Sequence, residues 1–560
     1  MTSKASAVSN ATNWSLAFLR TLIENGVTDI VVCPGSRSQS LALLAAELAE
    51  RGLLTLHVVL DERAAGFLAL GLALESGRPA VVVTTSGSSV ANLHPAVVEA
   101  FHQGTPLLLV TADRPASVRA QGGGQTTFHV GMFAAAIRGT FDVPPAESPA
   151  DAEIGGATVA FDALTIALRE RGPVHVNPQF IEPLSSEAPK SYLESIHPGG
   201  LLVVERESVS VTIEATVGVV VVAGLGAGIR AEEWARELGA PLFAEIESGS
   251  HFGPHLVTDY RTIAVSPEFA DSIHTVVVVG RPTLSNVIDQ LCTREGVAVT
   301  VVQVGEGVPY RPTERARLVD EIVVTGSGDD IAREWGLAWA RRSRMTLDAQ
   351  VTEPAADVDG SLVDDHAARS AFARREMEIQ REPVTSDMIV RLVWDATWPH
   401  DRLVFGASSI IRIADSVLPG KPIRVHSNRG LAGIDGTIAT AQGIASASRR
   451  PDSPAGVTRL VLGDLAAAYD SSSLALITGP IQVIVCNNNG GRIFEGLDVK
   501  ATANPAHFES VMLTPQQVNF EALAEAYGIA YRRVETRGQL TSALTETAEP
   551  ILIEAPLLQG

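Results

Sequence analysis

The sequence predicts an α/β fold with parallel sheets arranged in three domains. Two observations support this class. Short apolar runs such as PAVVVTTSG and PIQVIVC recur along the 560 residues, and segments of helical periodicity separate them. Uninterrupted apolar strands are typical of parallel sheets that helices cover on both faces. A chain of this length has room for three or four domains, each with its own core, and its composition divides it into three segments.

The first segment, residues 1–190, predicts a parallel sheet whose strands end in polar loops. A helix over SLALLAAELAE follows the strand DIVVC, and a second helix over AAGFLALGLALES ends at Gly77. The carboxyl ends of parallel strands meet at one edge of a sheet, where α/β folds bind ligands. The polar clusters that we expect at this edge are residues 36–38, 61–63, 85–87 and 113–114.

The second segment, residues 195–345, repeats the α/β pattern in VGVVVVAGLGAG and TVVVVGRPT. Its Gly224, Gly226 and Gly228 match a dinucleotide-binding fingerprint only in part, because Ile229 stands where the last glycine is expected. We therefore expect a tight strand-to-helix turn that needs glycine torsions, rather than a nucleotide site.

A polar linker is predicted over residues 346–382, because the stretch TEPAADVDGSLVDDH is polar and rich in Asp and Ala. The third segment, residues 383–560, resembles the first in its layout of apolar strands that end in polar loops. Duplication of one α/β domain would explain this shared layout.

A strand–helix–strand unit in the third segment carries most of the functional information. Asp464 ends the strand RLVLGD, and the triple asparagine at 487–489 ends the strand PIQVIVC, with room for one helix between them. Such a crossover makes the two strands parallel, so both polar ends lie at one sheet edge. Carboxylate and amide oxygens suit Mg²⁺, which usually keeps phosphate oxygens among its ligands, and a helix N-terminus favours anions. The unit predicts a metal–diphosphate clamp.

Charge and composition exclude several classes of protein. A net charge of −21 argues against binding to nucleic acid and to anionic membranes. The N-terminus has no secretory signal pattern, and no apolar run approaches the ~18 residues of a membrane span, so we expect a cytoplasmic protein. The three cysteines, whose spacing suggests neither zinc nor disulfides, are expected to be buried reduced thiols: Cys33, Cys292 and Cys486.

Eight motifs, in order along the two outer segments, resemble the 2-succinyl-5-enolpyruvyl-6-hydroxy-3-cyclohexene-1-carboxylate synthase family. They are CPGSRSQSLAL, DERAAGFLALGLA, TTSGSSVANLHPAVVEA, LLLVTADRP, GASSIIRIAD, SNRGLAGIDGTIATAQG, GDLAAAYD and NNNGGRIFE. The resemblance is weaker in the middle segment. It implies a thiamine diphosphate-binding fold with pyrimidine-binding, central and diphosphate-binding domains. The implied reaction, part of menaquinone biosynthesis, decarboxylates 2-oxoglutarate and adds the succinic-semialdehyde carbanion to isochorismate.

The resemblance also implies roles for individual residues. Alone, Glu62 reads as a solvated residue that the helix dipole favours at a helix start, but within this family it would activate the aminopyrimidine of the cofactor. The implied catalytic residues are Glu62 and Arg412. The implied substrate-binding residues are Ser36, Arg37, Arg114, Gln125, Ser408, Arg412 and Arg429. The implied cofactor-binding residues are Glu62, Ile434, Gly463, Asp464, Leu465, Ala466 and Asn488. The implied ligands of Mg²⁺ or Mn²⁺ are Asp464, Asn488 and the main-chain carbonyl of Gly490.

Some positions depart from the family pattern, and two other functions stay open. Relatives often carry Ser or Thr at Ala466 and Asn at Gly124, and Arg281 is only a weak substitute for a family lysine. A different thiamine diphosphate enzyme, such as an acetohydroxyacid synthase-like carboligase or a 2-oxoacid decarboxylase, is one alternative. A non-catalytic protein that kept the fold is the other, although it predicts loss of Glu62 or of the metal ligands. The resemblance further implies a homodimer or a dimer of dimers. The stretch at residues 494–508 is polar and rich in small residues, and we expect it to close over substrates.

Overall fold

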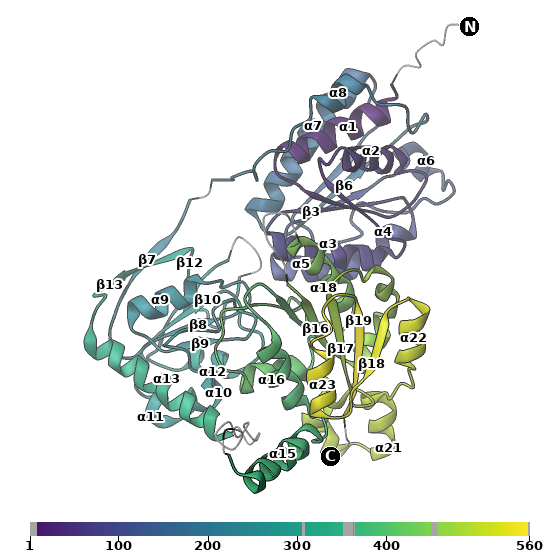
Figure 1. Ribbon diagram of the computed structural model, residues 1–560. Coiled ribbons are helices and arrows are strands. Elements are labelled where there is room, and N and C mark those ends of the chain that lie inside the picture. Colours follow the sequence, from purple (N-terminus) through teal and green to yellow (C-terminus); the bar gives the residue numbers. More distant parts are fainter. Residues whose placement is uncertain are drawn as a thin grey trace. The chain divides into compact units, whose positions relative to one another are not determined.

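Figure 1 shows the computed structural model, which describes residues 8–205, 207–304, 309–350, 362, 364–449 and 456–557. The chain folds into two compact units. Of the described residues, unit 1 contains 8–205, 207, 309 and 428–449, and unit 2 contains 208–304, 310–350, 362, 364–427 and 456–557. All ladder pairings between the strands described are parallel, which confirms the predicted α/β class.

Unit 1 is built on a six-stranded sheet of order β2-β1-β3-β4-β6-β5. Its inner strands are Val- and Leu-rich and completely buried, as expected of strands covered on both faces. The strands are β1 (Asp29–Val32), β2 (Thr55–Val58), β3 (Ala80–Thr84), β4 (Leu107–Thr111), β5 (Gly139–Val143) and β6 (Pro173–Pro178). The helices are α1 (Asn10–Glu24), α2 (Gln39–Glu50), α3 (Glu62–Ser76), α4 (Ser88–Asn92), α5 (His94–Gln103), α6 (Ala116–Ala120), α7 (Pro149–Arg169), α8 (Lys190–Glu194) and α18 (Thr437–Ser448).

Helices α3 and α18 pack closely in unit 1, although one comes from the first segment of the chain and the other from the third. Two glycines make this approach possible. A Cβ on Gly71 would lie 2.1 Å from the carbonyl oxygen of Thr440, and one on Gly443 would lie 2.2 Å from that of Leu68. Helix α3 ends at Gly77 as predicted, with a left-handed φ of 66°.

Unit 2 contains a five-stranded sheet of order β12-β11-β10-β8-β9, a β13-β7 pair and a six-stranded sheet of order β15-β14-β16-β17-β19-β18. The first two hold β7 (Ser210–Glu214), β8 (Val219–Ala223), β9 (Leu242–Ala244), β10 (Thr275–Val279), β11 (Ala298–Val302), β12 (Arg317–Val319) and β13 (Glu321–Thr325). The third holds β14 (Arg402–Phe405), β15 (Arg424–His426), β16 (Thr458–Gly463), β17 (Ile481–Asn487), β18 (Ala530–Arg533) and β19 (Ile551–Pro556).

The two six-stranded sheets have the same strand order when each is numbered along its own segment of the chain. This agrees with the layout that the outer segments share in sequence. The helices of unit 2 include α9 (Arg230–Leu238), α10 (Tyr260–Ile263), α11 (Pro267–Ala270), α12 (Val287–Thr293), α13 (Asp330–Gln350), α15 (His366–Gln380), α16 (Ser386–Ala396), α17 (Ser409–Val417), α19 (Asp464–Tyr469), α20 (Val499–Thr502), α21 (Pro505–Phe508), α22 (Phe520–Ala526) and α23 (Arg537–Ala543).

The structure describes residues 346–350, 362 and 364–382 of the predicted linker, and most of these residues are helical. Helix α13 continues to Gln350 and α15 begins at His366, while residues 351–361 and 363 lie outside the described residues. None of the described helices is long and apolar enough to cross a membrane. The three cysteines are buried as predicted, and burial raises the pKa of each thiol to about 12, so they stay protonated.

Candidate active site

The parallel pairing of β16 and β17 in unit 2 brings the two halves of the predicted clamp to one sheet edge. Their register pairs Gly463 with Cys486, so Asp464 and Asn488 follow the ends of neighbouring strands. The predicted strand–helix–strand unit is confirmed, although the α-helix occupies only the first part of the connection. Helix α19 ends at Tyr469, and a 3-10 helix follows over Ser471–Leu476. Asp and Ser side chains compete with the backbone for hydrogen bonds, which explains why the α-helix stops at this point.

Asp464 is held in place by the turn that follows β17. Its Oδ2 accepts a hydrogen bond from the backbone N–H of Gly490 at 2.8 Å. The residue is only 5% exposed, and burial raises the pKa of its carboxyl, although the N–H groups of Gly490, Asp464 and Leu465 act in the opposite direction. A bound cation at this position would favour the charged carboxylate.

Asn488 supplies a second oxygen that suits a cation. Its Oδ1 is buried and accepts no hydrogen bond from the part of the chain that the structure describes, which is costly unless a ligand occupies it. The turn is tight, because a Cβ on Gly490 (φ 133°) would lie 2.5 Å from the carbonyl oxygen of Leu513. The described residues contain no group of three or more His, Cys, Asp or Glu side chains arranged for a metal. An amide oxygen, a carboxylate and a peptide carbonyl nevertheless fit Mg²⁺ or Mn²⁺.

Glu62 occupies the first position of α3 in unit 1. The Asp61 side chain caps this helix by accepting the N–H groups of Arg63 and Ala64 at 3.0 and 3.2 Å. Oε2 of Glu62 accepts a hydrogen bond from Nδ2 of Asn92 at 3.0 Å. Asn92 therefore orients the predicted acid.

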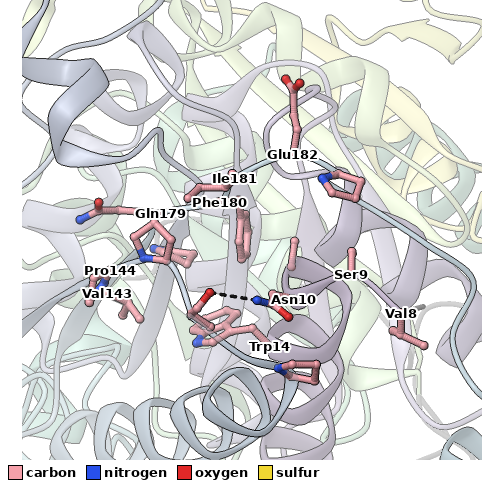
Figure 2. Close-up of a pocket in the computed structure, with 16 residues that line it drawn as sticks. Val8, Ser9, Asn10, Trp14, Val143, Pro144, Gln179, Phe180, Ile181 and Glu182 are labelled. Atoms are coloured by element: carbon pink, nitrogen blue, oxygen red, sulfur yellow. Dashed lines mark hydrogen bonds between the residues drawn. The ribbon is translucent and has the colours of Figure 1, made fainter. Parts of the chain in front are cut away.

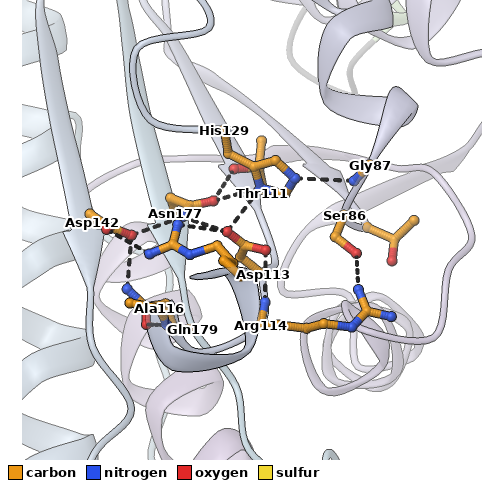
Figure 3. A network of polar contacts seen from close by, with 12 residues as sticks. Ser86, Gly87, Thr111, Asp113, Arg114, Ala116, His129, Asp142, Asn177 and Gln179 are labelled. Carbon is orange, nitrogen blue, oxygen red and sulfur yellow. Dashed lines mark hydrogen bonds and ion pairs between the residues drawn. The ribbon is translucent and has the colours of Figure 1, made fainter. Parts of the chain in front are cut away.

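Arg114, Gln125 and Ser86 form one hydrogen-bonded group at the carboxyl edge of the unit 1 sheet. Nη1 of Arg114 donates to Oγ of Ser86 at 2.7 Å and to the carbonyl of Gln125 at 3.0 Å, and Nε2 of Gln125 donates to the carbonyl of Ser86 at 2.8 Å (Figure 3 shows the Ser86 contact). Burial and the charge of Arg114 lower the pKa of Arg37. The positively charged guanidinium groups of Arg37 and Arg114 together favour the binding of an anion.

A groove of about 410 Å³ lies in unit 1 among Trp14, Phe180 and the proline-rich segments after β5 and β6 (Figure 2). None of the predicted site residues lines it. One contact links it to the predicted site: Nη1 of Arg37 donates to the carbonyl of Phe180, which lines the groove, at 3.2 Å.

Arg429 and Ile434 belong to unit 1, where Glu99 of α5 holds the loop that carries them. The Glu99 carboxylate accepts the N–H groups of Gly430 and Leu431 at 2.6 and 2.8 Å. Arg429 is 4% exposed, whereas Ile434 is 41% exposed and its side chain can meet a ligand.

Ser408 and Arg412 lie together at the start of α17 in unit 2. Ser408 is the N-cap, and Nη1 of Arg412 donates to its carbonyl at 3.1 Å. Asp415 on the same helix is fully buried and accepts hydrogen bonds from the backbone N–H of Ile246 at 2.7 Å and from the Tyr260 hydroxyl at 2.8 Å. The helix is thereby tied to the segment after β9.

The predicted residues thus divide between the units. Unit 1 holds Ser36, Arg37, Glu62, Arg114, Gln125, Arg429 and Ile434; unit 2 holds Ser408, Arg412, Gly463, Asp464, Leu465, Ala466, Asn488 and Gly490. The sequence analysis missed Asn92 and Glu99, for which the sequence has no signal, and assigned no role to Ser86, although it lies in one of the polar clusters. The predicted loop at 494–508 is not irregular throughout, because α20 and α21 lie within it.

Comparison with known proteins agrees with this geometry. Residues 12–132 match the family described as "Thiamine pyrophosphate enzyme, N-terminal TPP binding domain", and residues 412–555 match the corresponding "C-terminal TPP binding domain". Together with the parallel sheets, these matches define the class of thiamine diphosphate-dependent enzymes, which confirms the predicted fold and cofactor.

Similarity to individual proteins extends along nearly the whole chain. A protein of Leifsonia xyli subsp. xyli is 44% identical over 98% of this chain and 96% of its own length. A protein of Clavibacter michiganensis subsp. michiganensis is 47% identical with the same coverage, and one of Kineococcus radiotolerans is 37% identical over 94% and 92%. All three are named 2-succinyl-5-enolpyruvyl-6-hydroxy-3-cyclohexene-1-carboxylate synthase. The chain belongs to this synthase family, as its motifs predicted.

Proposed function

We propose that this protein joins 2-oxoglutarate to isochorismate with loss of CO₂ and yields 2-succinyl-5-enolpyruvyl-6-hydroxy-3-cyclohexene-1-carboxylate. In this reaction the bond between C1 and C2 of 2-oxoglutarate breaks, and a new carbon–carbon bond forms to the conjugated double bond of isochorismate, which takes up one proton. The observation that carries the proposal is the near-full-length similarity to synthases of this name. It favours this reaction over that of an acetohydroxyacid synthase-like enzyme.

The clamp of unit 2 is proposed to hold the metal and, through it, the diphosphate. Asp464, Asn488 and the carbonyl of Gly490 would ligate Mg²⁺ or Mn²⁺, supported by the buried Oδ1 of Asn488, which has no hydrogen-bond partner among the described residues. Gly463, Leu465 and Ala466 would lie against the diphosphate, with backbone N–H groups as donors because Ala466 has no hydroxyl. When bound, thiamine diphosphate supplies the electron sink for decarboxylation and carbanion formation. Residues 383–560 would form the diphosphate-binding domain and residues 195–345 the central domain.

Glu62 is proposed to hold a proton at the aminopyrimidine ring, with residues 1–190 as the pyrimidine-binding domain. A carboxylate is suited to this role because its hydrogen bond strengthens as the ring nitrogen gains positive charge. Asn92 supports this role because its Nδ2 donates to Oε2 of Glu62 and so orients the carboxylate. Ile434 would contact the cofactor through its exposed apolar side chain.

The arginines are proposed to bind the substrate carboxylates. Both substrates are dicarboxylates, and the net charge of −21 repels them, so attraction depends on local cations. Arginine can bind a carboxylate through two parallel hydrogen bonds, and loss of one such partner in a dry site costs about 2–5 kcal/mol. Arg412 is proposed to touch the reacting substrate. The proposed substrate-binding set is Ser36, Arg37, Arg114, Gln125, Ser408, Arg412 and Arg429.

Incubation of the protein with isochorismate, 2-oxoglutarate, thiamine diphosphate and Mg²⁺ tests the function. We expect a product with the mass of the two substrates minus CO₂. Replacement of 2-oxoglutarate by pyruvate is the matched control and should give no adduct. CO₂ release from pyruvate together with no adduct from 2-oxoglutarate would favour the alternative carboligase.

The assembly and compartment follow from the same family. We propose a homodimer or a dimer of dimers in the cytoplasm, with the segment at 494–508 closing over bound substrates. Sedimentation of the protein with and without thiamine diphosphate tests the assembly, and a monomer under both conditions would contradict it.

A further inference from the structure

A buried histidine that the proposed chemistry does not use lies behind the Arg114 group. His129 is 0% exposed, and its Nε2 lies 3.0 Å from the backbone nitrogen of Gly87. A peptide nitrogen can only donate, so Nε2 is the acceptor. His129 therefore carries its proton on Nδ1, which lies 2.9 Å from Oδ1 of Asn177.

Asn177 is consistent with this tautomer, because its hydrogen bonds fix the orientation of its side-chain amide and point Oδ1 at His129. Its Nδ2 donates to Oδ2 of Asp113 at 3.2 Å and to Oδ1 of Asp142 at 2.9 Å, so its Oδ1 can only accept. That oxygen accepts from Nδ1 of His129 and from the hydroxyl of Thr111 at 2.8 Å. Figure 3 shows these side chains converging on Asn177. A network in which every member is satisfied holds its groups rigidly.

The network fixes the position of the loop after β3, because His129 accepts a hydrogen bond from Gly87 in this loop. Gly87 has φ 96° and ψ −140°, a conformation that is essentially restricted to glycine. His129 holds the N–H of Gly87, and the neighbouring Ser86 contacts Arg114 through Oγ and Gln125 through its carbonyl. Ser86 is 1% exposed, so its position depends on these contacts and on the Gly87 peptide.

We propose that His129 is a positioning residue: as a hydrogen-bond acceptor for Gly87 it sets the loop that aims Arg114 at a substrate carboxylate. The inference rests on the proposed function, because Arg114 is there assigned to a dicarboxylate substrate. His129 itself touches no substrate. It acts two hydrogen bonds away from the guanidinium, through Gly87 and Ser86.

The proposal predicts an effect on substrate affinity with little effect on turnover. In His129→Leu the acceptor is lost and the KM of one dicarboxylate should rise about three- to tenfold, the range for loss of one hydrogen bond, while kcat at saturation stays within about twofold. His129→Gln keeps a carbonyl acceptor and an N–H donor, so it should restore most of the affinity. His197→Leu, at an exposed histidine of unit 1, is the matched control and should leave both constants unchanged.

Steady-state kinetics of the holoenzyme with both substrates tests this, with the unfolding midpoint and calorimetric binding of thiamine diphosphate measured for every variant. Ser86→Ala provides a second route if His129→Leu folds poorly, because it removes one of the two acceptors of Arg114 Nη1 and leaves His129 in place. The effects of His129→Leu and Ser86→Ala should be less than additive in the double variant. Unchanged KM values, a loss confined to kcat, or a failure of His129→Gln to restore affinity would overturn the proposal. Absence of product from the wild-type protein would instead contradict the proposed function.

Discussion

The carboxylate of Glu99 accepts a hydrogen bond from the backbone N–H of Gly430 at 2.6 Å, although 331 positions separate the two residues in the chain. Leu431 donates to the second oxygen at 2.8 Å. Burial raises the pKa of Glu99 and these two N–H groups act against that effect. The loop that carries Arg429 is thereby joined to the first segment of the chain within unit 1.

Replacement of Glu99 should therefore destabilise unit 1. Glu99→Ala leaves two backbone N–H groups without their acceptor, and each such group costs about 1–3 kcal/mol. We expect the free energy of unfolding in urea to fall by about 2–6 kcal/mol. Glu47→Ala, which removes only a half-exposed pair with Arg51, is the control and should cost less than about 1 kcal/mol. Equal effects of the two substitutions would contradict this role of Glu99.

Asp464→Asn should abolish tight binding of metal and cofactor. The substitution removes the negative charge that a divalent cation needs, while the amide still fills the space beside Gly490. We expect the affinity for thiamine diphosphate in the presence of Mg²⁺, measured by calorimetry, to fall at least about 100-fold, in line with loss of a charged partner in a buried site. Asp387→Asn, at an exposed carboxylate of unit 2, should bind normally. Normal heat of binding in the Asp464 variant would exclude the clamp.

Glu62→Gln should nearly stop hydrogen–deuterium exchange at the thiazolium carbon of the bound cofactor. The amide cannot hold a proton at the aminopyrimidine nitrogen as a carboxylic acid does. Exchange is measured by NMR after acid quench, and Glu50→Gln, at an exposed position of α2, should exchange at the wild-type rate. Near-normal exchange in the Glu62 variant would remove this residue from the mechanism.

Unit 1 should lose stability in mild acid through His175. Burial, with a smaller effect from the nearby His129, lowers the pKa of His175 from 6.5 to about 4. Between pH 6.5 and pH 4, His175 is protonated in the unfolded chain but stays neutral in the folded protein. The stability that depends on neutral His175 is therefore complete above pH 6.5 and is lost as the pH falls towards 4. The difference corresponds to about 3 kcal/mol.

Urea unfolding at pH 7 and at pH 4.5 measures this effect. The loss of unfolding free energy between the two pH values should be smaller in His175→Gln than in the wild-type protein, because glutamine does not titrate. Parallel losses in both proteins would assign the acid sensitivity to other groups.

Much of the architecture could be predicted from the sequence, because strands and helices are indicated by patterns among residues that are neighbours in the chain. Uninterrupted apolar runs indicated parallel strands, and polar residues directly after them indicated the ligand-binding edge. Asp464 and Asn488 were placed correctly because a crossover brings consecutive strand ends together. The sequence pattern did not show that the α-helix after Asp464 would stop at Tyr469 and be followed by a 3-10 helix at Ser471–Leu476.

The sequence by itself determined the class of fold, the family, the position of Asp464 and Asn488 at two consecutive strand ends and the helix-start position of Glu62. Only the tertiary structure decided the partners that hold these groups: Asn92 beside Glu62, Glu99 beneath the Gly430 loop and His129 behind Gly87. The physical reason is that strand and helix periodicity depend on neighbours in the chain. A hydrogen bond between side chains or loops depends on which distant segments packing brings together, here across 42 positions for His129 and 331 for Glu99.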